Sequence, residues 1–273
     1  MIPNNTKIKE IEEQGKSIRY ELFEKFCIIQ EGHPGSILSI FDIVNALYLS
    51  ETIKIDPKED HNDAFIMSKG HAAAVQYPFL VRKGFISQSE WDNWGKNDSM
   101  LRVFGNFDIP GIDVTSGSLG HGVGIAAGMT LANRANGINR NNFVVISEGE
   151  LYEGSTWEAL LFVAHHNLTE VKIILDVNRN MILGRPEEQL SLESFDKKFE
   201  AFNFETKRIN GHDYSEIFNG LEFLLKSDFS PRVLIADTIK GKGVSFMEDR
   251  PESHYWGGLN DQQMKTMLKD LSK

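Results

Sequence analysis

The chain has 273 residues, of which 41% are hydrophobic and 25% are charged, and its formal net charge is −10 at pH 7. This length and composition are typical of one globular α/β domain with a sizeable core, so we expect a single domain over residues 1–273. The acidic balance, without any basic stripe, argues against a nucleic-acid partner.

The N-terminal segment is polar, and no run approaches the roughly 20 apolar residues that a membrane span requires. The single cysteine, Cys27, excludes an intrachain disulfide and is expected to pack in the core. Together these features predict a cytoplasmic protein that has no membrane partner.

Hydrophobic periodicity predicts the elements of the first half of the chain. In chain order these are a helix over 5–30, a helix over 36–50, a strand over 64–67, a helix over 72–81 and a helix over 122–135. Residues 97–120 are rich in glycine and aspartate and predict an ordered loop over a site. The small residues of 122–135 suit close packing at a subunit or layer interface.

Strands and helices alternate in the second half. They are a strand over 143–147, a helix over 153–166, a strand over 171–178, a helix near 192–201, a strand near 204–209, a helix near 214–226, a strand over 233–237 and a helix near 260–271, with an irregular loop at 181–190. Such alternation implies right-handed crossovers, which predict an α/β fold with a parallel sheet and helices on both faces.

Two of the buried strands end abruptly in acidic or amide side chains. One strand leads into Glu148 and Gly149, and the next leads into Asn178. Because ligands bind at the carboxyl ends of strands in open α/β sheets, the two ends should lie side by side. Mg²⁺ and Ca²⁺ bind carboxylate and amide oxygens and share them with phosphates, and a glycine lets the backbone approach a phosphate closely. These residues therefore suit a site in which one such cation holds a diphosphate. Asp176 is expected to orient neighbouring backbone rather than to bind metal.

These two strand ends resemble the thiamine diphosphate fingerprint, in which a Gly-Asp-Gly strand end is followed by a strand end containing Asn. In transketolases the first block typically reads Gly-Asp-Gly-Glu-Leu-x-Glu-Gly, whereas Ser147 to Gly154 reads Ser-Glu-Gly-Glu-Leu-Tyr-Glu-Gly. The chain therefore departs from the family at Ser147 and at Glu148, whose extra methylene moves the carboxylate.

Four further blocks follow the order found in transketolases and extend the resemblance over nearly the whole chain. They are Gly32-His33-Pro34-Gly35, Ser68-Lys69-Gly70-His71, the run from Pro110 to Gly122, and Thr238-Ile239-Lys240-Gly241-Lys242-Gly243 with His254 shortly afterwards. Taken alone, each block also fits a plainer role. His33 could merely pack in a loop, His71 could be incidental beside a helix cap, and the two lysines could be solvated.

The resemblance implies a thiamine diphosphate-binding fold and a role for each matching residue. His33 would face the sugar as a proton donor or acceptor, and His254 would reach the diphosphate and the transferred unit. His71 would bind the diphosphate, while Gly117 and Leu119 would contact the cofactor rings. The remaining implied contacts are Gly149, Glu150 and Asn178 to the cofactor, and Glu148, Asn178 and the Asn180 carbonyl to Mg²⁺ or Ca²⁺. Glu153 matches a glutamate that relatives place at a dimer interface.

Thiamine diphosphate reacts through a C2 carbanion, which relatives form with a glutamate from a second, pyrimidine-binding domain. Only 19 residues follow His254. We therefore expect the N-terminal, diphosphate-binding subunit of a split transketolase. A separate pyrimidine-binding chain would complete each site in an α₂β₂ heterotetramer, and this chain alone would be inactive.

The expected reaction is transfer of a two-carbon ketol unit from a ketose to an aldose, on sugars or sugar phosphates. Relatives usually carry a Gly-His-Pro segment whose histidine contacts the donor hydroxyls, whereas residues 105–110 are shorter and lack histidine. Two alternatives stay open. One is another thiamine diphosphate enzyme, either a carboligase acting on an unusual sugar or a 2-oxoacid dehydrogenase α subunit. The other is a non-catalytic regulatory subunit with a metal site weakened by Glu148.

Overall fold

The computed structural model describes residues 3–226, 230–255 and 258–273. Its centre is a parallel sheet with strand order β1-β2-β3-β5-β4. The strands are β1 (Ala64–Met67), β2 (Asn142–Ser147), β3 (Val171–Val177), β4 (Glu205–Asn210) and β5 (Arg232–Asp237). Ser147 pairs in register with Asp176, so the carboxyl ends of β2 and β3 lie side by side as predicted.

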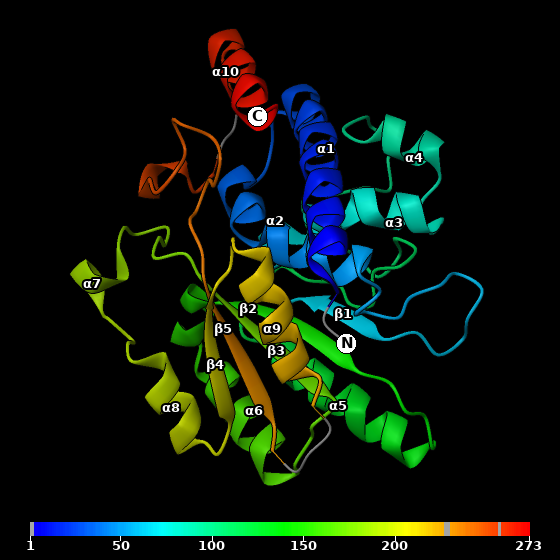
Figure 1. Cartoon of the computed structure of the whole chain (residues 1–273), viewed down its shortest axis with the longest axis vertical. Coiled ribbons are helices and arrows are strands. Elements are labelled where there is room, and N and C mark those ends of the chain that lie inside the picture. Colours follow the sequence, from blue (N-terminus) through cyan, green and yellow to red (C-terminus); the bar gives the residue numbers. More distant parts are fainter. Residues whose placement is uncertain (1–2, 227–229, 256–257) are drawn as a thin grey trace.

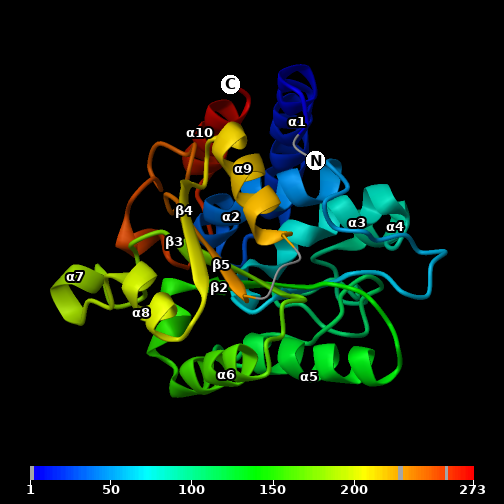
Figure 2. The same cartoon turned by 60° about the horizontal axis from the view of Figure 1, so that its bottom comes forward.

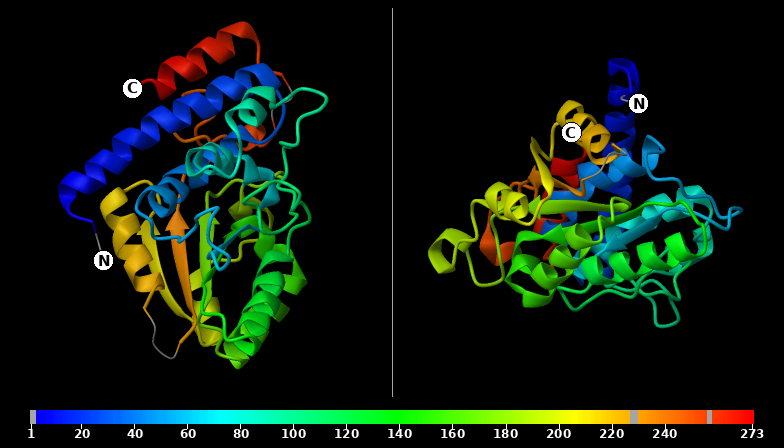
Figure 3. Two further views of the ribbon diagram at one scale, coloured as in Figure 1. Left: turned by 90° about the vertical axis from the view of Figure 1, so that its right-hand side faces the viewer. Right: turned by 90° about the horizontal axis from the view of Figure 1, so that it is seen from below.

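Helices cover both faces of this sheet, which confirms the predicted fold class (Figures 1 and 2). One side carries α1 (Asn5–Ile29), α2 (Pro34–Leu49), α3 (Tyr77–Lys83), α4 (Gln88–Asn93), α9 (Tyr214–Leu224) and α10 (Asp261–Leu271). The other side carries α5 (Gly122–Ala135), α6 (Gly154–His165) and α8 (Phe195–Ala201). Figure 3 shows α10 lying along α1 at the top of the molecule.

The strand side chains alternate between two hydrophobic clusters, as expected for a sheet buried on both faces. In β2, Phe143 and Val145 join the cluster under α1 and α2, whereas Val144 and Ile146 join the cluster over α5 and α6. Among the described residues, no helix is both long and apolar enough to cross a bilayer.

The predicted helix over 72–81 is wrong as one continuous element. The structure has a 3₁₀ helix, η1 (Gly70–Gln76), followed directly by α3. Pro78 explains the break, because proline has no backbone N–H and favours the first turn of a new helix. The sequence prediction also missed α4 and the short elements η2 (Glu148–Tyr152), α7 (Pro186–Gln189) and η3 (Pro251–Ser253). Residues 97–120 contain no helix or strand, as we predicted for a loop.

A buried ion pair joins the strand ends under the sheet's carboxyl edge. Lys69, just after β1, pairs with Asp176 at the end of β3, and both side chains are fully buried. Ser39 of α2 donates a hydrogen bond to Asp176 at 2.7 Å, and Thr238, just after β5, also donates to it. One carboxylate therefore links α2 and the ends of three strands.

Replacing Lys69 by methionine leaves the Asp176 carboxylate buried without its cation. We expect the free energy of unfolding to fall by about 3–5 kcal/mol, the usual cost of breaking a buried pair. Lys242→Met is the matched control, because this ammonium meets Glu248 at the surface, 3.1 Å away. An exposed pair contributes less than about 1 kcal/mol. Urea unfolding at neutral pH measures both variants, and equal losses would contradict the structural role of Lys69.

Candidate active site

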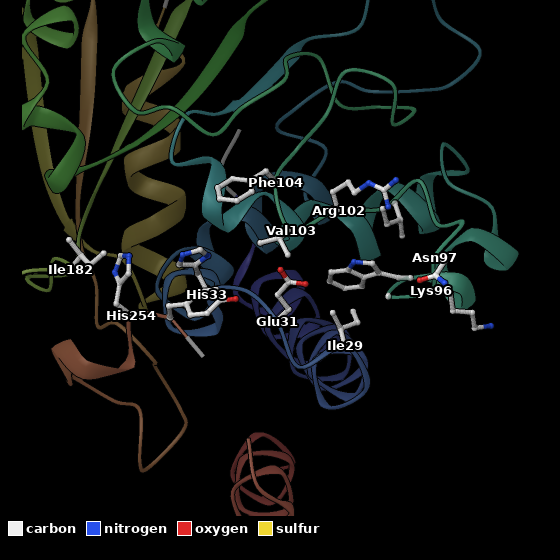
Figure 4. A pocket seen from close by; sticks show the side chains of 14 residues that line it. Ile29, Glu31, His33, Lys96, Asn97, Arg102, Val103, Phe104, Ile182 and His254 are labelled. Atoms are coloured by element: carbon white, nitrogen blue, oxygen red, sulfur yellow. The ribbon is translucent and has the colours of Figure 1, made fainter. Parts of the chain in front are cut away.

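Two adjoining cavities form the candidate site, and the first of them lies at the carboxyl edge of the sheet. The first has a volume of about 550 Å³ and gathers seven of the predicted site residues. These are His71, Leu119, Glu148, Gly149, Asn178, Asn180 and His254. The second has a volume of about 940 Å³ and is lined by His33, Phe104 and Tyr255 among others. Ile182 and His254 line both cavities and therefore mark the junction between them (Figure 4).

Three histidines from distant parts of the chain meet at this junction. The His33 ring centroid lies 5.1 Å from that of His71 and 5.3 Å from that of His254. Burial and the neighbouring Lys240 ammonium lower the pKa of His33 to about 4 and that of His254 to about 3. Burial and Lys69 likewise lower the pKa of His71. All three imidazoles are therefore neutral at physiological pH, and each can donate one proton and accept another.

Lys240 connects two of the predicted site residues. Its buried ammonium donates to the Asn180 carbonyl at 3.2 Å and to His254 Nδ1 at 2.6 Å. A protonated Lys240 can only donate, so in that state His254 Nδ1 accepts and the ring proton of His254 is on Nε2. Burial and the nearby Lys69 charge lower the pKa of Lys240 to about 7. Lys240 is thus part of the site, whereas Lys242 is a surface residue paired with Glu248.

Glu148 presents a carboxylate that needs a partner. Its Oε1 atom is buried and has no hydrogen bond among the described residues. Burial and then the negative charges of Asp176 and Glu187 raise the pKa of Glu148 to about 8. A buried oxygen without a partner is costly unless a donor or a cation completes it. The longer Glu148 side chain therefore still fits a hard cation.

Neighbouring oxygens extend this donor set. Asn178 Nδ2 lies 3.3 Å from Asp176, to which it donates, so its Oδ1 faces the other way and accepts the Asn180 N–H at 3.2 Å. No group of three or more His, Cys, Asp or Glu side chains that could hold a metal occurs in the described ranges. A cation here would accordingly combine one carboxylate with amide and phosphate oxygens, which is typical of Mg²⁺.

Asp176 contacts side chains, whereas we predicted that it would orient neighbouring backbone. Its carboxylate accepts hydrogen bonds from the side chains of Ser39, Lys69, Thr238 and Asn178. The reason is its place at the end of the central strand β3, between the segments that follow β1 and β5. Burial would raise the pKa of Asp176, but the Lys69 charge and these hydrogen bonds lower it below its ordinary value.

Glu150 and Gly117 line neither cavity. The 3₁₀ turn η2, capped by Ser147, directs the Glu150 carboxylate toward Ser68 and toward the Gly120 N–H, which donates to it at 3.0 Å. In this position the Glu150 carboxylate supports the glycine-rich loop at Gly120. We had predicted that it would contact the cofactor instead. Gly117 packs closely against Gly70, because a Cβ added to Gly70 would lie 2.6 Å from the Gly117 nitrogen.

The loop that lacks the family histidine presents a different residue to the site. The Asn106 side chain is used within the loop, because its Oδ1 accepts hydrogen bonds from Asp108 N and Thr115 Oγ1, each at 3.2 Å. Phe104 lies at the cavity instead, with its ring centroid 6.1 Å from that of His33. Sequence reasoning missed Phe104, and the shortened loop was the only signal that could have found it.

Known proteins resemble this chain over nearly its whole length. The chain is 33% identical to one of the subunits of the apulose-4-phosphate transketolase of Phocaeicola vulgatus, over 97% of this chain and 95% of that protein. It is 32% identical to 6-deoxy-6-sulfo-D-fructose transketolase subunit SqwG of a Clostridium species, over 97% of each. Human transketolase is 30% identical, but the match covers only 40% of that protein.

A solved structure shows the same relationship. The transketolase of Campylobacter jejuni superposes with a TM-score of 0.86 at 27% identity, over 98% of this chain and 43% of that one. The family model described as the transketolase thiamine diphosphate binding domain matches residues 13–272. The chain therefore belongs to the transketolase family of transferases and carries the thiamine diphosphate binding domain of that family.

Proposed function

We propose that this chain is the diphosphate-binding subunit of a split transketolase. It transfers a two-carbon ketol unit from a ketose donor to an aldose acceptor, with thiamine diphosphate and Mg²⁺ (or Ca²⁺). The observation that carries the proposal is the meeting of three neutral histidines at the junction of two cavities, beside the unpartnered carboxylate of Glu148. The single cysteine favours a cytoplasmic location.

When bound, thiamine diphosphate supplies the carbon nucleophile and electron sink for breaking and forming a carbon–carbon bond. His71 would donate an imidazole N–H to the diphosphate from the start of η1. Glu148, Asn178 and the free lone pair of the Asn180 carbonyl would hold the cation that shares the diphosphate. Leu119 and Gly149 line the same cavity and would enclose the cofactor.

His33 and His254 would manage protons on the substrate. The buried His33 Nδ1 has no hydrogen bond among the described residues, so it is free to hold a proton on, or take one from, a substrate oxygen. His254 would offer its Nε2–H from the junction of the cavities, because Lys240 occupies Nδ1. Depressed pKa values keep both rings neutral and able to act in either direction.

The proposed partner is a pyrimidine-binding chain, in an α₂β₂ heterotetramer. Two of the relatives above are named as transketolase subunits, which supports a site divided between chains. The outer face of α5 and α6 suits this partner, because four large apolar side chains are exposed on it and a Cβ on Gly128 would meet nothing within 4 Å. The exposed apolar residues are Ile125, Leu131, Leu161 and Phe162. Glu153, directly before α6, lines the cofactor cavity and so connects this face with the site.

A second candidate is a thiamine diphosphate carboligase subunit that acts on an unusual sugar. The observation that favours it is Phe104 beside His33, at a place where a hydroxyl-binding side chain is absent. Two relatives are named for an apulose phosphate and a sulfonated deoxyfructose, so the split subunits that resemble this chain are named for different sugars.

His71→Ala tests the cofactor site. Titration calorimetry of thiamine diphosphate with Mg²⁺, into this chain mixed with its partner, should show affinity about 10- to 100-fold weaker than for the unmodified pair, because one hydrogen bond to a charged group is lost. His61→Ala changes an exposed histidine that lines neither cavity, and this variant should bind the cofactor normally. Unchanged affinity in His71→Ala would contradict the assignment of the diphosphate site.

Glu148→Gln tests the cation site through stability. Below about pH 4.5 the Glu148 carboxyl is protonated in both states and contributes nothing. As pH rises to about 8, the unfolded chain ionises this group first, so the unmodified chain loses stability relative to Glu148→Gln. Urea unfolding without metal should show this growing difference. Mg²⁺ with thiamine diphosphate should then stabilise only the unmodified pair, and equal stabilisation of both would contradict a Glu148 ligand.

A further inference from the structure

The active-site segment, residues 238–241, leaves the sheet at the end of β5 and runs to the start of α2. At one end, the Thr238 N–H donates a hydrogen bond to the Val177 carbonyl at 3.0 Å. At the other end, the Gly241 N–H donates to the Gly35 carbonyl, in the first turn of α2, at 3.0 Å. Both ends are therefore held by the main chain of neighbouring elements, and the position of the middle depends on what binds the residues between them.

His212, which follows β4, binds the middle of this segment. The Ile239 N–H donates to the Nε2 atom of His212 at 2.9 Å. Because a backbone N–H can only donate, Nε2 accepts, and the one proton on the ring nitrogens is on Nδ1. Nδ1 donates to the Asp42 carboxylate of α2, 2.8 Å away. The ring, only 9% exposed, thus connects the active-site segment with α2.

The Asp42 carboxylate has further partners that hold it in place. Arg19 of α1 lies 3.5 Å from its Oδ1 atom, and the Tyr214 hydroxyl of α9 donates to the same atom at 3.3 Å. Asn45 donates in turn to the Tyr214 oxygen at 2.8 Å. The carboxylate is therefore anchored among three helices, and the imidazole extends that anchoring to the active-site segment.

The position of Ile239 matters for the site because Lys240 is the next residue. The Lys240 ammonium donates to His254 Nδ1 at 2.6 Å, while His33 stands at the start of α2. The placement of the active-site segment against α2 therefore sets how these two imidazoles meet, with 5.3 Å between their ring centroids. We propose that His212 is a positioning residue of the active site. Its bond to the Ile239 N–H keeps Lys240 against His254, and so keeps the ring proton of His254 on Nε2. The inference rests on the proposed function, in which that Nε2–H serves the substrate.

Two substitutions separate the two bonds of the His212 ring. A glutamine amide lies about as far from the backbone as Nε2, so His212→Gln can still accept the Ile239 N–H. An asparagine amide reaches only as far as Nδ1, so His212→Asn can bind Asp42 but leaves the Ile239 N–H without an acceptor. Tyr214→Phe is the control for structural damage, because it removes a hydroxyl from the same network and leaves Ile239 bonded. Urea unfolding ranks the loss of stability in all three variants.

The first measurement is the tautomer of His254, by ¹⁵N NMR of the full chain at about pH 6. At this pH Lys240, whose pKa is lowered by burial to about 7, is mostly protonated, and His254, whose pKa is lowered by burial to about 3, is neutral. The unmodified chain, His212→Gln and Tyr214→Phe should keep the proton on Nε2. In His212→Asn the two ring nitrogens of His254 should share the proton, and their chemical shifts should converge. A proton that stays on Nε2 in His212→Asn overturns the inference.

The second measurement is kcat of the reconstituted pair of chains at saturating thiamine diphosphate and Mg²⁺. His212→Asn should lower kcat about tenfold, because a small displacement of a reacting group slows the reaction strongly. His212→Gln and Tyr214→Phe should stay within about twofold of the unmodified pair. Equal losses of kcat in both His212 variants overturn the inference. If His212→Asn does not fold, His212→Ser removes the same bond and leaves room for water. An unmodified pair that converts no ketose overturns the proposed function, and the tautomer of His254 then still decides the positioning role.

Discussion

The buried ion pair between Lys69 and Asp176 is the constraint on which the site depends. It holds the end of β1 against the end of β3, and Thr238 brings the segment after β5 to the same carboxylate. Each of these three residues lies two positions before a residue of the cofactor cavity. His71 lies two residues after Lys69, Asn178 two residues after Asp176, and Lys240 two residues after Thr238. Fixing the pair therefore fixes the histidine, the amide and the ammonium relative to one another.

The electrostatics of the cavity match an anionic cofactor that shares a cation. On a chain with a net charge of −10, the cofactor cavity holds Lys240 and the neutral imidazoles of His71 and His254, and His33 lies in the adjoining cavity. The buried Glu148 Oε1 has no hydrogen bond among the described residues, and burial together with the Asp176 charge raises the pKa of Glu148 to about 8. A diphosphate with Mg²⁺ would satisfy both sides at once, since the phosphates meet N–H donors and the cation meets Glu148.

Four of the strands were predictable because β1, β2, β3 and β5 are short buried runs rich in apolar residues, and parallel strand ends must share one edge of the sheet. That argument placed Glu148 and Asn178 together without reference to any relative. The histidines came from the resemblance, because nothing in local periodicity brings residues 33, 71 and 254 to one point. The turn η2 was not predictable from periodicity, so the direction of Glu150 was missed. Phe104 and the Lys69–Asp176 pair were missed because both depend on contacts between distant segments.

The most direct test of the account is transfer of labelled carbon by the reconstituted pair of chains. A ketose phosphate labelled with ¹³C at its first two carbons is mixed with an unlabelled aldehyde acceptor, thiamine diphosphate and Mg²⁺, and the products are followed by NMR. The account predicts that both labelled carbons appear together in the new ketose, only when both chains and the cofactor are present. Cofactor-dependent transfer by the partner chain alone, or no transfer by the complete mixture with any ketose tested, would contradict it.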